Sequence, residues 1–230
     1  MTYFAASRGN HENMNDSDYI IFDFDGTIAD TFDLALEIYN RIAPEYNCRP
    51  AGPEDHELIR LKKPQELLKI YGVSRLKLLS LLLRVRKELS RHIPEIKLVR
   101  GMEASLREIR NSGYRMGILT SNSVSNVSMF VDINNLSGLF DFIYSGKSLF
   151  GKENVIRRML MHENLSVNRV IYVGDETRDI EASKKAGIPV VAVSWGLHRR
   201  EVLATMSPDQ IADDPVELQG CLLRIFNGRP

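Results

Sequence analysis

The chain has 230 residues, and its 30 lysines and arginines balance its 30 aspartates and glutamates, so the formal net charge is zero. This length suits one domain, or a core with a modest insertion, and it can bury a hydrophobic core without disulfides or structural metal. The absence of a basic excess argues against a protein that binds nucleic acid.

The first 17 residues show no hydrophobic periodicity, and we expect a polar, flexible N-terminal arm there. They lack the basic start and the apolar run of about 7–15 residues that mark a signal peptide. No apolar run in the chain approaches the roughly 18 residues that a membrane span needs. Cys48 and Cys221 have neither metal-ligand nor disulfide-framework spacing, and we interpret them as incidental thiols of a reducing compartment. We therefore predict a cytoplasmic protein that binds no membrane.

The segment "YIIFDF", residues 19–24, is a short apolar run rich in strand-forming residues, which predicts a buried strand. From residue 31 to about 97 the pattern becomes helical. Apolar residues recur at helical spacing in 31–46, Pro64 and Gly72 suit the start and end of a helix, and Ser74 is a candidate N-cap for a longer one.

Beyond residue 98, helices and short apolar strands alternate. The predicted helices are 101–113, 123–134, 152–164, 177–187 and 215–226, and the predicted strands are 114–120, 140–145, 169–175 and 188–196. Such alternation predicts an α/β fold, a Rossmann-like parallel sheet with helices on both faces. The core would comprise residues 18–30 and 98–230, and residues 31–97 would form a small all-helical cap over the ligand-binding edge of the sheet.

Polar residues follow four of the predicted strands. They are Asp23, Asp25, Gly26 and Thr27 after the first, Thr120, Ser121 and Asn122 after the next, Lys152 after the third, and Asp175, Glu176 and Asp179 after the fourth. Because parallel strands place their carboxyl ends along one edge of a sheet, we expect these groups to converge.

This set of residue types indicates a particular chemistry. Clustered carboxylates repel one another unless a cation lies among them, and oxygen ligands favour a hard cation such as Mg²⁺. A lysine and the amides of helix N-termini favour an anion, and phosphate suits them best. We therefore expect Mg²⁺ as cofactor, a small phosphorylated metabolite as substrate, and phosphoryl transfer through a covalent aspartyl phosphate.

The motifs "DFDGT" and "LTSN", a lysine at the start of a helix, and "GDETRD", in this order, resemble the haloacid dehalogenase superfamily along essentially the whole core. The helical insertion after the first motif is similar to that family's helical cap. The phosphoglycolate phosphatase-like hydrolases are the most similar group, as "AVSWG" and "DQIADDPVEL" also suggest. The resemblance implies a phosphatase that hydrolyses phosphoric monoesters.

The resemblance implies that Asp23 is the nucleophile and that Asp25 is the general acid and base. It also implies that Mg²⁺ is held by Asp23, by Asp25 through its backbone carbonyl, and by Asp175, while Asp179 contacts the metal or its waters or orients Lys152. The alternative for Asp23 and Asp25 is a pair that caps a helix.

Phosphate would be bound by the Thr120 hydroxyl and the backbone amides of Ser121 and Asn122, although these residues could also simply cap a helix. Gly26 permits the tight turn beside them. Lys152 would neutralise the phosphate and Asp23.

Lys147 is the rival for the lysine role. The family often has Lys-Pro at this position, where this chain has Lys-Glu. Glu176 is expected to cap a helix or to support the metal ligands, and Arg178 is expected to be structural or to pair with a carboxylate. Trp195 is expected in the core.

The cap carries a basic cluster, His56, Arg60, Lys62 and Lys63, which would suit a second acidic group on the substrate or form a solvated face. The segment "LLSLLLRVR" is expected to pack against the other cap helices rather than to bind an apolar ligand.

The leading functional prediction is a Mg²⁺-dependent phosphatase, and phosphoglycolate is a candidate substrate. We expect a monomer or a homodimer. A phosphomutase would use the same core, a phosphonate hydrolase would need a Schiff-base lysine in the cap, and a non-catalytic binding or regulatory protein is the alternative from another class. The presence of both Asp23 and Asp25 favours an enzyme, and Asp25 favours hydrolysis over halide displacement.

Overall fold

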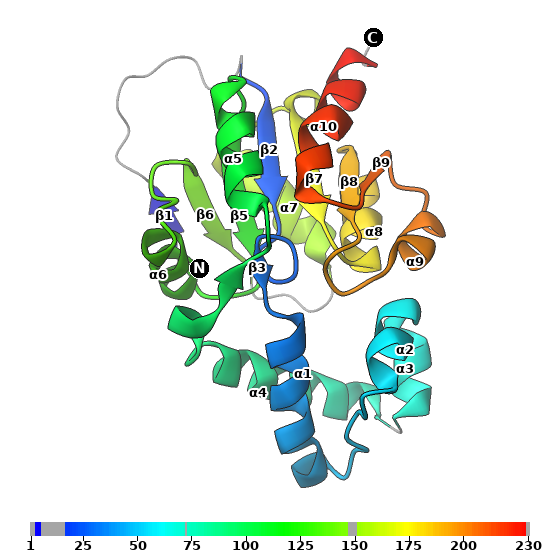
Figure 1. Cartoon of the computed structure of the whole chain (residues 1–230). Coiled ribbons are helices and arrows are strands. Elements are labelled where there is room, and N and C mark those ends of the chain that lie inside the picture. Colours follow the sequence, from blue (N-terminus) through cyan, green and yellow to red (C-terminus); the bar gives the residue numbers. More distant parts are fainter. Residues whose placement is uncertain (1–2, 6–16, 72, 147–150, 229–230) are drawn as a thin grey trace.

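The computed structural model describes residues 3–5, 17–71, 73–146 and 151–228, and its centre is a seven-stranded sheet (Figure 1). The strand order is β1-β6-β5-β2-β7-β8-β9. The strands are β1 (Tyr3–Ala5), β2 (Tyr19–Phe22), β5 (Arg115–Thr120), β6 (Phe142–Ser145), β7 (Val170–Gly174), β8 (Val190–Val193) and β9 (Gln210–Ala212). All neighbouring pairs are parallel except β1 with β6, which confirms the predicted fold class.

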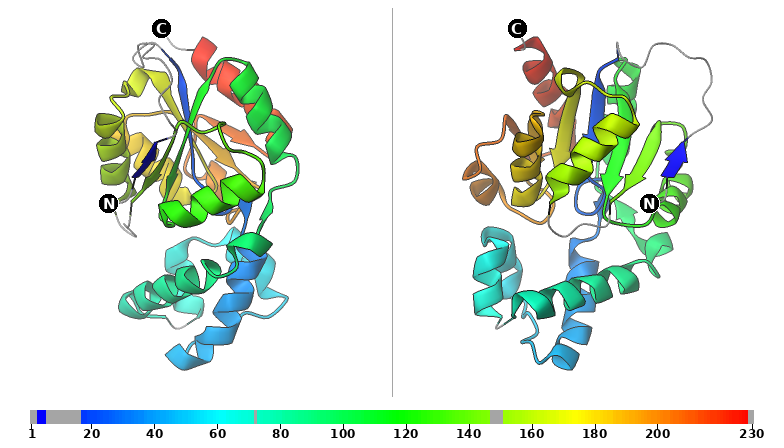
Figure 2. Two further views of the ribbon diagram at one scale, coloured as in Figure 1. Left: turned by 90° about the vertical axis from the view of Figure 1, so that its left-hand side faces the viewer. Right: turned by 180° about the vertical axis from the view of Figure 1, so that it is seen from behind.

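Helices cover both faces of this sheet (Figure 2). They are α5 (Met102–Asn111), α6 (Val124–Ile133) and α10 (Leu218–Asn227) on one side, and α7 (Lys152–His162) and α8 (Thr177–Ala186) on the other. Alternate residues of β2 explain the two cores, since Ile20 and Phe22 pack with the first set and Tyr19 and Ile21 with the second. This central strand is therefore buried on both faces.

A second group of helices lies beyond the carboxyl ends of the strands, toward which the arrowheads point in Figure 1. This helical group consists of α1 (Phe32–Ile42), α2 (Asp55–Leu61), α3 (Pro64–Ile70) and α4 (Arg75–Leu89). The Ser74 side chain accepts a hydrogen bond from the Lys77 amide at 3.3 Å, so it caps α4 as predicted.

The chain enters and leaves the helical group through a small antiparallel ladder of β3 (Ala29–Asp30) and β4 (Lys97–Leu98). Two residues per strand are too few to show a period in the sequence, and this ladder was not predicted. It lies near the limits 30/31 and 97/98 that the sequence suggested, and the division of the chain into domains there stays a prediction.

Three short core elements were also not predicted. They are β1, within the stretch expected to be a flexible arm, α9 (Arg200–Ala204) and β9. Each has three to five residues, and edge strands as short as β1 and β9 depend on a preformed neighbour for their hydrogen bonds. The predicted helix 215–226 begins with a 3₁₀ turn, Pro215–Glu217, before α10.

Two further findings concern the whole described chain. Cys48 and Cys221 are both buried and unpaired. Within the described ranges, no helix combines the length and the apolar character that a membrane crossing requires.

Candidate active site

The predicted polar groups converge at the carboxyl ends of β2, β5 and β7, which we call the carboxyl edge. β2 lies between β5 and β7, and all three are parallel, so the loops that follow them are neighbours. Lys152 comes after β6, which is parallel to β5, and it is the first residue of α7.

Asp23 directly follows β2 and is only 5% exposed. Its backbone amide still donates to the carbonyl of Val173 in β7, at 2.9 Å, so the sheet fixes its position. One carboxylate oxygen, Oδ1, accepts from the Phe24 amide at 2.8 Å. The other, Oδ2, accepts from Lys152 Nζ at 2.6 Å. The carboxylate is thus held in one orientation beside a cation.

Lys152 also donates to Asp179 Oδ1 at 2.5 Å, and its ammonium lies 5.1 Å from the centre of the Tyr172 ring. Burial by itself would lower the pKa of Lys152, but the negative charges of Asp179 and Asp23 raise it well above its usual value. The lysine therefore stays charged. The rival, Lys147, lies outside the described residues.

Three carboxylates of the carboxyl edge, those of Asp23, Asp175 and Asp179, have ligand atoms that all lie within 4.8 Å of one another. Asp175 is 1% exposed, and burial together with the charges of Glu176, Asp179 and Asp23 raises its pKa well above the usual value. Such repulsion is relieved when a cation lies between the carboxylates.

A divalent cation fits this donor set. Asp175 Oδ1 accepts from the Thr27 hydroxyl at 3.0 Å, and Oδ2 accepts from the Leu197 amide at 2.7 Å, which orients the carboxylate. Asp179 is already bonded at both oxygens, to Lys152 and to the Glu176 amide. Oxygen ligands of this kind suit Mg²⁺.

Asp25 is partly buried, and its Oδ1 atom has no hydrogen-bond partner among the described residues. Burial and the nearby charge of Asp23 raise its pKa to about 6. Its carboxylate does not belong to the three-carboxylate cluster. A carboxyl group in this state can hold a proton near neutral pH and release it again.

Gly26 has φ +77°, in the left-handed region that favours glycine. A Cβ atom at this position would lie 2.3 Å from Asp175 Oδ2. The backbone turn after β2 therefore approaches a carboxylate from the end of β7 more closely than any side chain would allow.

The predicted phosphate-binding residues follow β5. Thr120 is 2% exposed, and with Ser121, Lys152 and Arg178 it lines one small hollow. The Asn122 amide donates to the Thr120 hydroxyl at 2.9 Å, and its role in binding phosphate stays a prediction.

Glu176 and Arg178 behave as the sequence suggested. Glu176 forms a capping box with Asp179 at the start of α8, and Arg178 donates to Glu176 Oε1 at 2.5 Å. The negative charges of Glu176 and Asp179 raise the pKa of Arg178 against the effect of its burial. Its place beside Thr120 and Lys152 was not predicted, because nothing local in "ETRD" shows which way the arginine points.

A second cation that sequence reasoning missed comes from the helical group. Arg86 of α4 is partly buried, and its pKa is lowered by that burial and by the positive charge of Arg178. The negative charges of Asp25 and Glu176 act in the other direction and raise the pKa of Arg86. Its sequence context, "LLLRVRKEL", is that of an ordinary amphipathic helix and carries no signal for this role.

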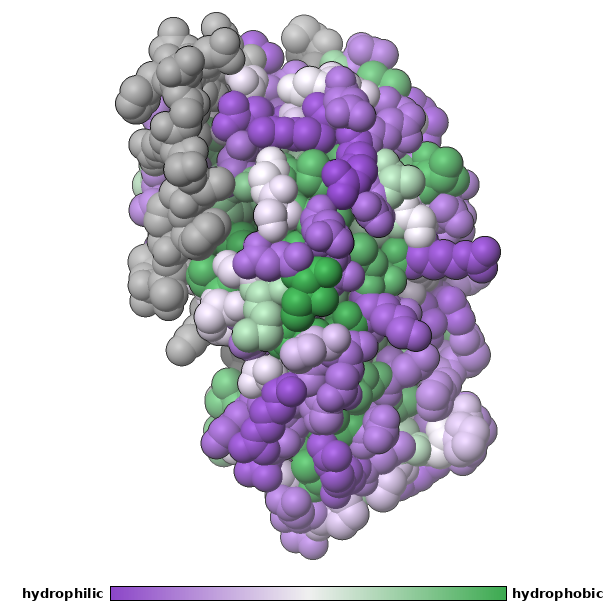
Figure 3. Space-filling model, turned by 60° about the vertical axis from the view of Figure 1, so that its left-hand side comes forward, coloured by the Kyte–Doolittle hydropathy of each residue, from purple (hydrophilic) through white to green (hydrophobic). Residues whose placement is uncertain are grey.

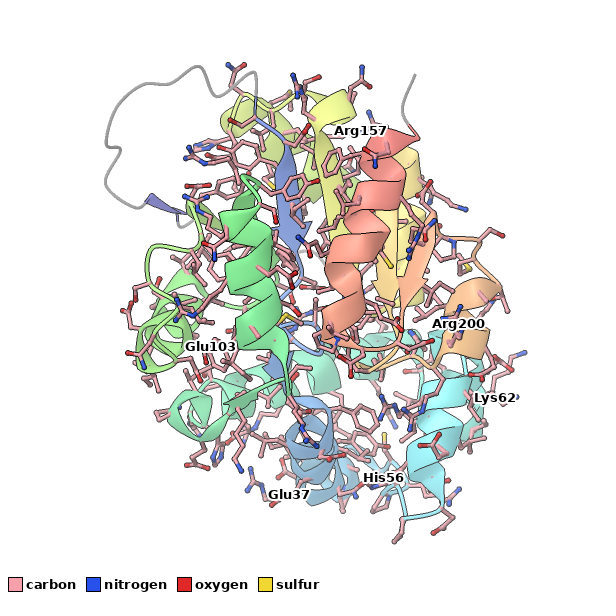
Figure 4. All side chains as sticks on the ribbon, turned by 45° about the horizontal axis from the view of Figure 1, so that its top comes forward. Glu37, His56, Lys62, Glu103, Arg157 and Arg200 are labelled. Atoms are coloured by element: carbon pink, nitrogen blue, oxygen red, sulfur yellow. The ribbon has the colours of Figure 1, made fainter. Side chains whose placement is uncertain are left out.

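The four residues of the predicted basic cluster have different partners. Arg60 donates to the carbonyls of Trp195 at 2.7 Å and Gly196 at 2.5 Å, so it connects α2 to the core. Lys62 pairs with Glu66 at 3.4 Å, and Lys63 occupies the N-cap position of α3. His56 extends from α2, with Asp33 of α1 at 3.9 Å (Figure 4).

Trp195, expected in the core, is half-buried and packs against it, and its indole nitrogen donates to the Thr27 carbonyl at 3.0 Å. A further ion pair, between Arg199 and Glu57, also connects the core to α2. The loop after β8 therefore contacts both the turn after β2 and the helical group.

Comparison with known proteins gave one family match and several relatives. A model of the haloacid dehalogenase-like hydrolase family matches residues 20–193. A phosphoglycolate phosphatase of Synechococcus elongatus is 33% identical over 199 residues, which cover 86% of this chain and 94% of that protein. Pyrophosphatase PpaX of Bacillus mycoides is 24% identical, covering 90% of this chain and 97% of that protein.

Among solved structures, a predicted phosphatase from Clostridium acetobutylicum superimposes with a TM-score of 0.75 at 20% sequence identity. The match covers 90% of this chain and 99% of that one. At this identity the likeness concerns the fold.

Proposed function

We propose a mechanism for this chain, which belongs to the haloacid dehalogenase-like hydrolase family and is a phosphatase. In this mechanism the enzyme uses Mg²⁺ and forms an aspartyl-phosphate intermediate on Asp23. One observation carries the proposal. The Asp23 carboxylate is fixed at the end of β2, bonded to Lys152 at 2.6 Å and clustered with Asp175 and Asp179.

In the first proposed step, an Asp23 oxygen attacks phosphorus and the bond from phosphorus to the leaving oxygen breaks. Asp25, whose pKa lies near 6, gives its proton to the leaving oxygen. Lys152 stabilises the negative charge that spreads over the phosphoryl oxygens. The products of this step are the alcohol and the phosphorylated Asp23.

In the second step, the Asp25 carboxylate takes a proton from water while that water attacks phosphorus. The bond between phosphorus and Asp23 breaks, so inorganic phosphate leaves and the carboxylate is restored. Thr120, Ser121 and Arg178, which line the same hollow as Lys152, are in place to bind the remaining phosphoryl oxygens.

Asp23, the Asp25 carbonyl and Asp175 would hold Mg²⁺, and Asp179 would support it while orienting Lys152. The bound ion would supply positive charge that offsets the negative charge of the phosphoryl oxygens and the carboxylates. The chain's own residues do the remaining work of attack, proton transfer and orientation.

The substrate class that we propose is a small phosphorylated metabolite. The names of the two relatives make phosphoglycolate and pyrophosphate natural members of a first test panel. A phosphomutase would transfer the phosphoryl group to a second hydroxyl instead of releasing it, and a non-catalytic binding protein would do neither.

The test measures phosphate release from such a panel with Mg²⁺, for the native protein and for Asp23→Asn. We expect Asp23→Asn to lower turnover by on the order of 10⁴-fold or more, because an amide is a poor nucleophile of the same shape. Asp132→Asn, at an exposed aspartate of α6, is the matched control and should leave turnover unchanged.

A chelator should stop the reaction, and added Mg²⁺ should restore it. Near-native turnover by Asp23→Asn would overturn the nucleophile assignment. Turnover that persists in chelator would overturn the metal dependence while leaving the nucleophile in place.

A further inference from the structure

The helical group lines a half-open cavity of about 290 Å³ whose wall is almost wholly apolar. Its lining includes Phe32 and Ala35 of α1, Leu67 and Leu68 of α3, and Leu81 and Val85 of α4. The last two belong to "LLSLLLRVR", the segment expected only to pack against neighbouring helices. Apolar side chains here do pack together, but they leave a space between them.

The cavity extends to the carboxyl edge. Two core residues, Glu176 and Leu197, complete its wall. Glu176 follows Asp175 in the chain, and the Leu197 amide donates to Asp175 Oδ2 at 2.7 Å. A molecule with its phosphate at the carboxyl edge could therefore place its organic part in this cavity.

The residues that line the cavity offer no cation to an acidic occupant. None of the described lining residues is a lysine, an arginine or a histidine, and the one charged side chain, Glu176, is an acid. Arg60 is bonded to core carbonyls, Lys62 to Glu66, and Arg86 interacts with the carboxylates of the carboxyl edge. A buried carboxylate without a cation loses its hydration and gains no partner.

The size of the cavity favours an organic group larger than two carbons. An apolar cavity of about 150 Å³ is enough for benzene, and this one is larger. Figure 3 shows apolar surface gathered at the level where the helical group meets the core, with hydrophilic residues over most of the lower part.

We propose that this cavity binds the apolar organic group of the substrate, so that the preferred substrates are phosphomonoesters of alkyl or aryl alcohols of about six or more carbons. The proposal rests on the phosphatase function proposed above. A two-carbon acid such as glycolate would neither fill the cavity nor pair its carboxylate there.

The test compares ethyl phosphate, hexyl phosphate and phosphoglycolate by their kcat/KM for phosphate release with Mg²⁺. Ethanol and hexanol are leaving groups of nearly equal acidity, so a difference between their esters reports binding rather than reactivity. Burial of each additional methylene favours binding about fourfold at most. We expect kcat/KM for hexyl phosphate to exceed that for ethyl phosphate by at least tenfold, and phosphoglycolate to do no better than ethyl phosphate.

Ala35→Leu places a larger side chain in the wall and makes the cavity smaller. It should lower the ratio of kcat/KM for hexyl phosphate to that for ethyl phosphate to below about threefold. The matched control is Glu37→Leu, which adds a leucine on the same helix at a side chain that is exposed and points outward (Figure 4). It should keep the native ratio. Thermal melting of both variants checks that α1 still folds.

A binding measurement separates this proposal from the phosphatase function. Calorimetric titration with ethylphosphonate and hexylphosphonate, which are not hydrolysed, should show tighter binding of the hexyl compound to the native protein and not to Ala35→Leu. If neither ester is hydrolysed but this preference is found, the cavity proposal stands and the proposed function fails.

If turnover depends on Asp23 but hexyl phosphate is no better than ethyl phosphate, or phosphoglycolate exceeds both, the cavity proposal is overturned and the phosphatase function stands. Equal affinity for the two phosphonates likewise overturns the cavity proposal. In that case the cavity is a gap in the packing of the helices.

Discussion

The carboxyl edge and the cavity of the helical group are neighbours built on opposite principles. At the carboxyl edge, Asp23, Lys152 and Asp175 are each bonded to groups from other loops, so charge and hydrogen bonds fix these three side chains. In the cavity, Leu81 and Val85 face an apolar space, and the size and apolar character of the wall select what can enter. We therefore expect that the reaction and the choice of organic group can be changed separately.

The largest effect that tests this separation comes from Lys152→Met. The substitution leaves the buried carboxylates of Asp23 and Asp179 without their shared cation, and we expect kcat to fall by on the order of 10³-fold for every substrate alike. Steady-state phosphate release measures it.

Lys185→Met is the matched control, because it removes a lysine that pairs with Glu181 on the exposed surface of α8. It should leave kcat unchanged. A loss of less than tenfold for Lys152→Met, with a large loss for Lys147→Met, would move the catalytic role to Lys147.

The sequence carried most of the information about the carboxyl edge. Each functional residue there lies within a few positions of the end of an apolar strand, and a parallel sheet brings such positions together whatever the details of packing. Asp23, Thr120 and Asp175 could therefore be placed by local pattern. The place of Arg178 beside Thr120 and Lys152 could not, because the local sequence does not show which way the arginine side chain points.

The second test acts on the geometry of the carboxyl edge through Gly26→Ala. The added Cβ would lie 2.3 Å from Asp175 Oδ2, so the carboxylate must move, and we expect Mg²⁺ affinity and kcat/KM to fall by about 100-fold. A titration of activity with Mg²⁺, and calorimetry of Mg²⁺ binding, measure the two effects.

Gly113→Ala is a matched control for backbone strain. Gly113 has φ +90°, but a Cβ there meets nothing within 4 Å. The Gly113→Ala substitution should lower the free energy of unfolding by about 1–2 kcal/mol and leave Mg²⁺ affinity unchanged. If both variants bind Mg²⁺ equally well, the close approach of Gly26 to Asp175 has no part in the metal site.

The cavity of the helical group was beyond the reach of sequence reasoning. Periodicity showed that residues 31–97 form helices, and the apolar faces of those helices were visible in "LLSLLLRVR". Whether such faces close on one another or leave a space depends on crossing angles and on side chains from four helices at once. The same limit explains why His56, Arg60, Lys62 and Lys63, adjacent in sequence, were read as one cluster although their partners differ.

The smallest effect concerns the contact between the two regions, and Arg60→Met tests it. The substitution removes two hydrogen bonds, to the Trp195 and Gly196 carbonyls, that share one nitrogen of the guanidinium. It should weaken the packing of the helical group on the core by about 1.5 kcal/mol, the lower end of the range for hydrogen bonds of a charged group. KM for hexyl phosphate should then rise about tenfold with kcat nearly unchanged, because the carboxyl edge keeps its own bonds. Arg84→Met, which removes an arginine paired within α4 to Glu88, is the matched control. A fall in kcat at constant KM would instead mean that Arg60 acts on Asp175 through the adjoining Leu197 amide, and the two regions would then not be separable.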